Sequence, residues 1–216
     1  MALEFSFSSI EIANARLWKN EIAAFQNQAP PRGVLFVGSS SIALWSTLGE
    51  DFPEISVINR GFGGSQLCDS VYHFDALFLT VAPRAVVFYA GDNDLACGRK
   101  PVRIAENFQL LAELMQTHLP EIPLFFISIK PSPARWNLIE KIRATNAQIE
   151  NICRRHAQLQ FVDMDSVMLD ENGNPRAEFY VEDELHLSPK GYAAWTGVLR
   201  PLLEPFADDA LNGKIE

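Results

Sequence analysis

Five short apolar segments alternate with longer amphipathic segments along this chain. The apolar segments are residues 34–37, 55–59, 84–89, 124–129 and 159–162. Segments of this length are too short for helices, and their few polar positions are typical of strands buried on both faces. Glycine, proline or small polar residues follow most of them, which is where a strand would end. The pattern predicts a parallel sheet of five strands.

The longer segments carry apolar residues at helical spacing. They are residues 10–25, 67–79, 102–118, 136–156 and 189–203. Ser188 and Pro189 are typical of a helix cap and first turn. Strands that alternate with helices predict a three-layer α/β/α fold, for which we expect the flavodoxin-like strand order 2-1-3-4-5. In that order the first strand lies between the second and third, so the loops after these three strands share one edge of the sheet.

The size of the chain favours one domain. Its 216 residues, 48% of them hydrophobic, are enough for a single large core. We therefore expect one domain over residues 1–216, with a helical lead-in at 10–27 and a loose polar tail at 207–216.

Charge and cysteine content narrow the function classes. The 18 Lys and Arg against 27 Asp and Glu give a net charge of −9, which repels nucleic acids and anionic lipid surfaces. The first residues include acidic ones and no long apolar run, so we expect no signal peptide, no membrane insertion and a cytoplasmic location. Cys68, Cys97 and Cys153 lack CxxC spacing, which argues against disulfides and a zinc cluster.

Small polar residues follow the first three strands, as GSSS at 38–41, GFGG at 61–64 and GDND at 91–94. A hydroxyl between a buried strand and a helix lies where open α/β sheets bind ligands, and free helix N–H groups favour negative charge there. Hydrolysis by serine also requires a base, a carboxylate that orients the base, and oxyanion donors. The GSSS turn predicts a serine nucleophile without selecting one of its three serines.

His186 is the candidate base. It stands in a loop before the last helix, whereas His73, His118 and His156 lie within or near the ends of predicted helices. Two carboxylates lie three and four residues before His186, at offsets that let side chains meet, and Glu184 should point elsewhere. These carboxylates are Asp183 and Glu182, and spacing alone leaves both open as its partner.

The four motifs, with DELH at 183–186 as the last, resemble in this order the GDSL-type esterases of the SGNH hydrolase superfamily, over residues 32–203. The resemblance implies Ser40 as nucleophile, with His186 as base and Asp183 as the acid that orients it. It also implies an oxyanion hole formed by the N–H groups of Ser40 and Gly64 and the side-chain amide of Asn93. The family's Gly-Asp-Ser-Leu signature is changed here to Gly-Ser-Ser-Ser.

Four further residues near these loops each have two interpretations. Asp92 and Asp94 flank an amide, which is more typical of a turn than of a divalent metal site, and we expect no metal or cofactor. Arg60 either pairs with one of these acids or contacts the substrate. Trp136 either lines the substrate pocket or packs in the core.

The expected function is hydrolysis of small-molecule carboxylic esters through an acyl-enzyme. A thioesterase, lysophospholipase or acyltransferase could use the same residues, and a flavodoxin-like anion-binding module is the alternative from another class. Asp92, Asp94, Glu182 and Glu184, with the net charge of −9, should disfavour anionic substrates. We therefore expect short acyl esters of neutral alcohols or sugars.

Overall fold

The computed structural model describes residues 7–26 and 32–208, and its centre is a five-stranded sheet. All neighbouring strands are parallel, and the order β2-β1-β3-β4-β5 confirms the predicted one. The strands are β1 (Gly33–Gly38), β2 (Val57–Gly61), β3 (Pro83–Tyr89), β4 (Leu124–Ile127) and β5 (Leu159–Val162). Every residue of β1 and β4 is buried, as expected for strands covered on both faces.

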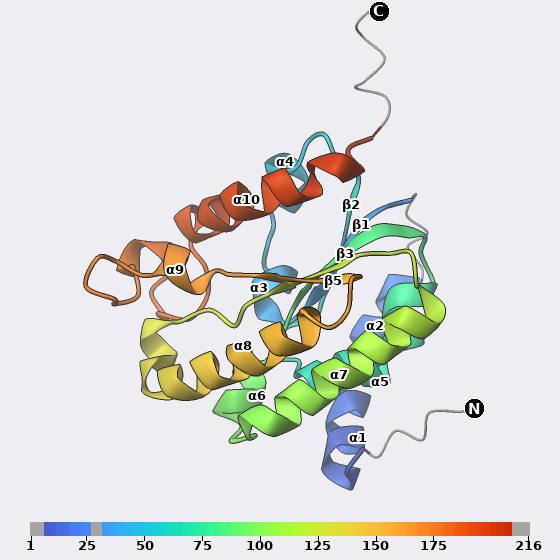
Figure 1. Cartoon of the computed structure of the whole chain (residues 1–216), viewed down its shortest axis with the longest axis horizontal. Coiled ribbons are helices and arrows are strands. Elements are labelled where there is room, and N and C mark those ends of the chain that lie inside the picture. Colours follow the sequence, from blue (N-terminus) through green and yellow to red (C-terminus); the bar gives the residue numbers. More distant parts are fainter. Residues whose placement is uncertain (1–6, 27–31, 209–216) are drawn as a thin grey trace, which may run out of the picture.

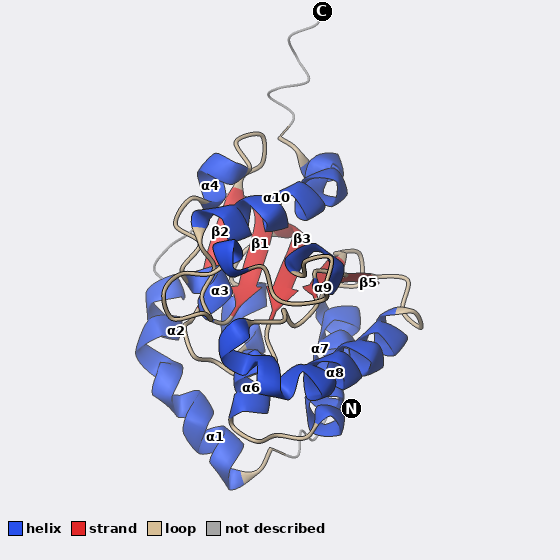
Figure 2. Ribbon diagram, turned by 90° about the vertical axis from the view of Figure 1, so that its left-hand side faces the viewer, coloured by secondary structure: helices blue, strands red, loops and turns tan. Residues whose placement is uncertain are grey.

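Helices cover the sheet on both faces (Figures 1 and 2). One face packs against α2 (Lys19–Gln26), α5 (Leu67–Tyr72), α7 (Pro101–His118) and α8 (Ile139–Cys153). The other packs against α3 (Ser40–Ala43), α4 (Leu48–Asp51), α9 (Asp165–Met168) and α10 (Pro189–Leu203). Two separate clusters of buried apolar side chains result, which confirms the three-layer α/β/α fold.

The predicted lead-in helix is divided into α1 (Ser9–Ala15), the 3₁₀ turn η1 (Arg16–Trp18) and α2. The start of α1 is encoded locally, because Ser8 and Glu11 form a capping box. The break follows a tertiary contact, since His73 Nε2 lies 2.8 Å from the carbonyl oxygen of Ala15. Residue 27 of the predicted lead-in lies outside the described residues.

Two other predicted helices also begin or end differently. The segment expected at 67–79 is α5 followed by a π-helical turn, η2 (Asp75–Leu79), and the segment expected at 136–156 enters α8 through the 3₁₀ helix η3 (Pro133–Leu138). Short helices lie between the larger elements. The helix α6 (Asp92–Ala96) follows β3, η4 (Ala177–Phe179) precedes α10, and η5 (Glu204–Phe206) follows α10. Over residues 7–26 and 32–208, no helix is both long and apolar enough to cross a membrane.

Asp208, in the described part of the polar tail, is bound to the rest of the fold. Asp208 Oδ2 accepts hydrogen bonds from the N–H and hydroxyl of Ser56, at 2.8 and 2.7 Å, and Asp208 also pairs with Arg84. The expectation of a loose tail is therefore wrong at this residue, because a charged partner lies in the fold. Residues 209–216 lie outside the described part.

Sheet register places the three motif loops at one level. Gly38 is aligned with Gly61 on β2 and with Tyr89 on β3. The residues after these three positions therefore leave the same edge of the sheet together, as the strand order predicted.

Candidate active site

The junction of β1 and α3 exposes one of the three serines. Gly38 has φ +152°, and a Cβ there would lie 2.0 Å from the Tyr89 carbonyl oxygen, so only glycine allows this close turn. The hydroxyls of Ser39 and Ser41 are buried and have no hydrogen-bond partner in the described part of the chain. Ser40 is half-buried and begins α3, so its N–H has no acceptor within the helix. Ser40 is thus the serine that a substrate can reach.

Neighbouring elements brace this turn although Ser39 replaces the family aspartate. Asn59 on β2 donates from Nδ2 to the Ile42 carbonyl, at 2.8 Å, and accepts from the Gly61 N–H at 2.9 Å. On the other side, the hydroxyl of Tyr192 on α10 donates to the Ser41 carbonyl at 3.1 Å. Sequence reasoning missed both residues, because neither Asn59 nor Tyr192 belongs to a motif.

The glycine loop after β2 lies against Ser40. A Cβ at Gly63 would be 3.9 Å from that of Ser40, and Gly64 has φ +84°, a conformation that favours glycine. The opposite side of Gly64 faces Trp18, whose ring would lie 3.3 Å from a Cβ there. Trp18 is fixed by a hydrogen bond from Nε1 to Asp69 Oδ2, at 3.1 Å. The lead-in segment therefore covers the glycine loop, and no local sequence pattern predicted this contact.

Asn93 on α6 has a defined amide orientation. Its Oδ1 accepts a hydrogen bond from Arg135 Nη2 at 2.9 Å, and its Nδ2 donates to the Ser65 carbonyl at 3.0 Å. An amide nitrogen carries two hydrogens, so one hydrogen of Nδ2 is left for another acceptor. This hydrogen is available to a substrate oxygen.

The two acids beside Asn93 are not an exposed rim. Asp92 is buried, with Oδ2 lying 2.9 Å from Arg135 Nη1 and 3.4 Å from Lys130 Nζ. Burial alone would raise the pKa of Asp92, but these two cations hold it below its ordinary value. Asp94 is also buried and accepts from the Leu67 N–H at 3.0 Å. The sequence-based view that Asp92 and Asp94 repel anionic substrates from an exposed position is therefore wrong.

Arg60 has a structural role instead of the two that we expected. Its buried guanidinium donates to the carbonyls of Ala76 and Leu77, at 2.7 and 2.8 Å, and to Thr80 Oγ1 at 2.6 Å. It thereby satisfies carbonyls of the π-helical turn η2, and its contacts are neither with Asp92 or Asp94 nor with the motif loops. The other residue considered for the substrate pocket, Trp136, is half-buried in η3.

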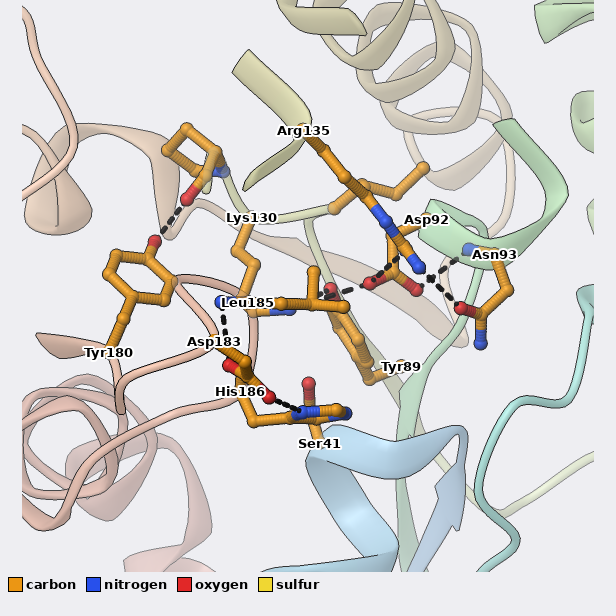
Figure 3. A network of polar contacts seen from close by, with 12 residues as sticks. Ser41, Tyr89, Asp92, Asn93, Lys130, Arg135, Tyr180, Asp183, Leu185 and His186 are labelled. Atoms are coloured by element: carbon orange, nitrogen blue, oxygen red, sulfur yellow. Dashed lines mark hydrogen bonds and ion pairs between the residues drawn. The ribbon is translucent and has the colours of Figure 1, made fainter. Parts of the chain in front are cut away.

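The loop before α10 pairs His186 with Asp183 rather than with Glu182. His186 Nδ1 lies 2.5 Å from Asp183 Oδ2, while Asp183 Oδ1 accepts from the N–H groups of Leu185 and His186, both at 2.9 Å (Figure 3). These hydrogen bonds lower the pKa of Asp183 to about 2. Glu184, at φ +58°, makes the turn that brings the His186 N–H back to the carboxylate. The imidazole therefore has its Nδ1 fixed and its Nε2 free of Asp183.

The expected chemical groups come from loops at one sheet edge, but one contact is not formed. Within residues 7–26 and 32–208, no hydrogen bond joins Ser40 to His186. Lys130 and Arg135 are polar residues that the sequence did not indicate, because the loop after β4 carries no motif.

Comparisons with known proteins show the family and the fold of this chain. The model of the GDSL-like Lipase/Acylhydrolase family matches residues 36–194, which include all four motifs. A search of curated proteins found no match.

Solved structures share the fold. A Streptococcus pneumonia protein whose description refers to platelet activating factor is 20% identical, with a TM-score of 0.79 over 91% of this chain and 100% of that one. A GDSL-like lipase from Bacteroides thetaiotaomicron is 24% identical, with a TM-score of 0.73 over 89% and 98%. A family 3 carbohydrate esterase from Clostridium thermocellum is 21% identical, with a TM-score of 0.65 over 82% and 100%.

Proposed function

Because the chain belongs to the GDSL-like lipase/acylhydrolase family and is a carboxylic ester hydrolase, we propose that Ser40, His186 and Asp183 form its catalytic triad. The observation that carries this proposal is the pairing of His186 with Asp183 in the loop before α10, together with a GSSS turn in which Ser39 and Ser41 have buried hydroxyls and Ser40 is half-buried. A flavodoxin-like module without catalysis does not agree with the family.

In the proposed reaction His186 Nε2 takes the proton of the Ser40 hydroxyl, and Ser40 Oγ attacks the ester carbonyl carbon. The carbonyl oxygen becomes an oxyanion. When the tetrahedral intermediate collapses, the bond to the alcohol breaks and His186 gives its proton to the leaving oxygen. His186 then deprotonates a water that attacks the acyl-enzyme, which releases the acid and restores Ser40. Asp183 stays ionised and stabilises the charged imidazole.

Three donors would receive the oxyanion. They are the N–H of Ser40 at the start of α3, the N–H of Gly64 in the glycine loop, and the remaining hydrogen of Asn93 Nδ2. Such donors act on charge that develops in the transition state, and donors that are already oriented cost little reorganisation.

We propose short acyl esters of neutral alcohols or sugars as the substrates. The charge of Asp92 does not support this proposal, because Asp92 is paired with Lys130 and Arg135. What supports it is the net charge of −9, together with the exposed Glu182 and Glu184 beside His186. One structural neighbour is described as a carbohydrate esterase.

A panel of p-nitrophenyl esters from acetyl to dodecanoyl tests this proposal, with acetylated sugars and an acyl thioester included. We expect the highest kcat/KM with acetyl or butanoyl esters, and loss of turnover in Ser40→Ala. Product analysis with added alcohol separates a hydrolase from an acyltransferase. Cleavage of the thioester alone, with no oxygen ester turned over, would contradict the proposal.

A further inference from the structure

The loop between β4 and α8 contacts both halves of the candidate site. Arg135 reaches Asn93 and Asp92 on one side, as Figure 3 shows. On the other side, the N–H of Ala134 donates to the Glu184 carbonyl at 3.1 Å, within the loop that carries His186. This one segment therefore links the oxyanion side of the site to the acid–base side.

Arg135 removes an ambiguity in how Asn93 presents its amide. A side-chain amide can turn either its oxygen or its nitrogen toward a ligand, but a guanidinium has only donors. The bond of 2.9 Å from Arg135 Nη2 thus selects Asn93 Oδ1 and sends Nδ2 to the other side. A reversed amide would lose this bond and place its hydrogens against a cation.

Asp92 holds the guanidinium in place. Asp92 Oδ2 lies 2.9 Å from Arg135 Nη1, and only 16% of the Arg135 side chain is exposed, so the planar group has little freedom to turn. Lys130 also pairs with Asp92, at 3.4 Å. Loss of the Arg135 charge would therefore leave Asp92 with one cationic partner rather than none.

We infer that Arg135 is a positioning residue for the proposed ester hydrolysis, since it orients the Asn93 amide nitrogen toward the developing oxyanion. The inference rests on the proposed function. Its charge also polarises the Asn93 amide, which makes the remaining N–H a stronger donor. Both effects stabilise the transition state more than the bound substrate, so their loss should lower kcat and leave KM nearly unchanged.

The test compares Arg135→Met, which keeps length but has no donors, with Arg143→Met as the matched control. Arg143 lies on α8 with 46% of its side chain exposed, and pairs with Asp165. We expect Arg135→Met to lower kcat by about 10- to 100-fold with little change in KM, and Arg143→Met to leave both unchanged. Added guanidinium ion should restore part of the kcat of Arg135→Ala, which a loss of folding would not allow.

Two further readouts separate positioning from general destabilisation. In the Asn93→Ala background, Arg135→Met should lower kcat by less than a further factor of about two, because the residue that Arg135 positions is absent. The side-chain amide signals of Asn93 in an NMR spectrum, assigned from their loss in Asn93→Ala, should shift in Arg135→Met but not in Arg143→Met.

These readouts distinguish two failures. Absence of ester turnover by the wild type would contradict the proposed function, while the Asn93 signals would still report on orientation. Unchanged Asn93 signals in Arg135→Met, or a full additional loss of kcat in the double variant, would overturn the inference whatever the substrate.

Discussion

Asp183 and Asp94 are two carboxylates whose pKa values shift in opposite directions. Hydrogen bonds from the N–H and imidazole of His186 lower the pKa of Asp183 to about 2. Burial, with the nearby charge of Asp69, raises the pKa of Asp94 to about 7 despite the bond from the Leu67 N–H. Asp183 is therefore ionised above about pH 4, whereas Asp94 carries a proton for much of the time near neutrality.

The proposed mechanism requires an unprotonated base, so kcat/KM should rise with pH. Asp183 should not contribute to this rise above about pH 4, because hydrogen bonds lower its pKa to about 2. Initial rates with an acetyl ester from about pH 5 to 8 check this. A flat profile would exclude His186 as the base in a rate-limiting step.

Asn93→Ala should lower kcat by about 10² to 10³ and change KM little, because the lost donor acts mainly on transition-state charge. Asn59→Ala is an informative comparison, since Asn59 braces the nucleophile turn without reaching the oxyanion. Steady-state kinetics of both variants provide the measurement. An Asn93→Ala effect confined to KM would make Asn93 a substrate-binding residue.

At the scale of elements, burial explains what could be predicted. The strands were visible because segments such as 34–37 are apolar on both faces, and the start of α10 was visible because Ser188 and Pro189 form a cap. The break after Ala15 and the π turn that Arg60 contacts depend on partners far away in the sequence. No local pattern encodes those contacts.

The site likewise contains residues that a local motif predicts and residues whose positions depend on distant contacts. Residues within motifs could be placed from the sequence, with the resemblance choosing Ser40 and Asp183 among alternatives. Lys130 and Arg135 could not, since a loop after β4 with two prolines and two cations has many possible conformations. Their contacts with Asp92 replaced the expected pairing of Arg60.

Asp94 on α6 accepts a hydrogen bond from Leu67 at the start of α5. The protonation of this carboxyl should make the stability of the protein depend on pH. Its folded pKa of about 7 lies above the usual aspartate value of 3.8, so its contribution to stability is fully present below about pH 4 and is lost as the pH rises through about 7. Asp94→Asn keeps an oxygen for the Leu67 N–H and cannot ionise.

Urea unfolding at several pH values checks this prediction. Between about pH 5 and 8, the unfolding midpoint of the wild type should fall relative to that of Asp94→Asn. The exposed Asp75→Asn serves as the control and should run parallel to the wild type. Parallel curves for Asp94→Asn as well would show that Asp94 does not titrate in this range.

For the molecule as a whole, the net charge of −9 should slow the approach of anionic esters. Because Asp92 is paired within the protein, this effect comes from the overall field and from Glu182 and Glu184. A matched pair of esters that differ by one carboxylate on the alcohol should show higher kcat/KM for the neutral ester at low salt, and a smaller difference at high salt. Equal rates at low salt would contradict this selection.

The measurement that tests the central claim most directly is covalent labelling of the three serines by a fluorophosphonate, combined with acetyl-ester hydrolysis. Ser40 is half-buried, while the hydroxyls of Ser39 and Ser41 are fully buried. Ser40→Ala should therefore lose both labelling and hydrolysis, and Ser39→Ala and Ser41→Ala should keep much of each. Labelling that survives in Ser40→Ala and disappears in Ser39→Ala or Ser41→Ala would contradict the account.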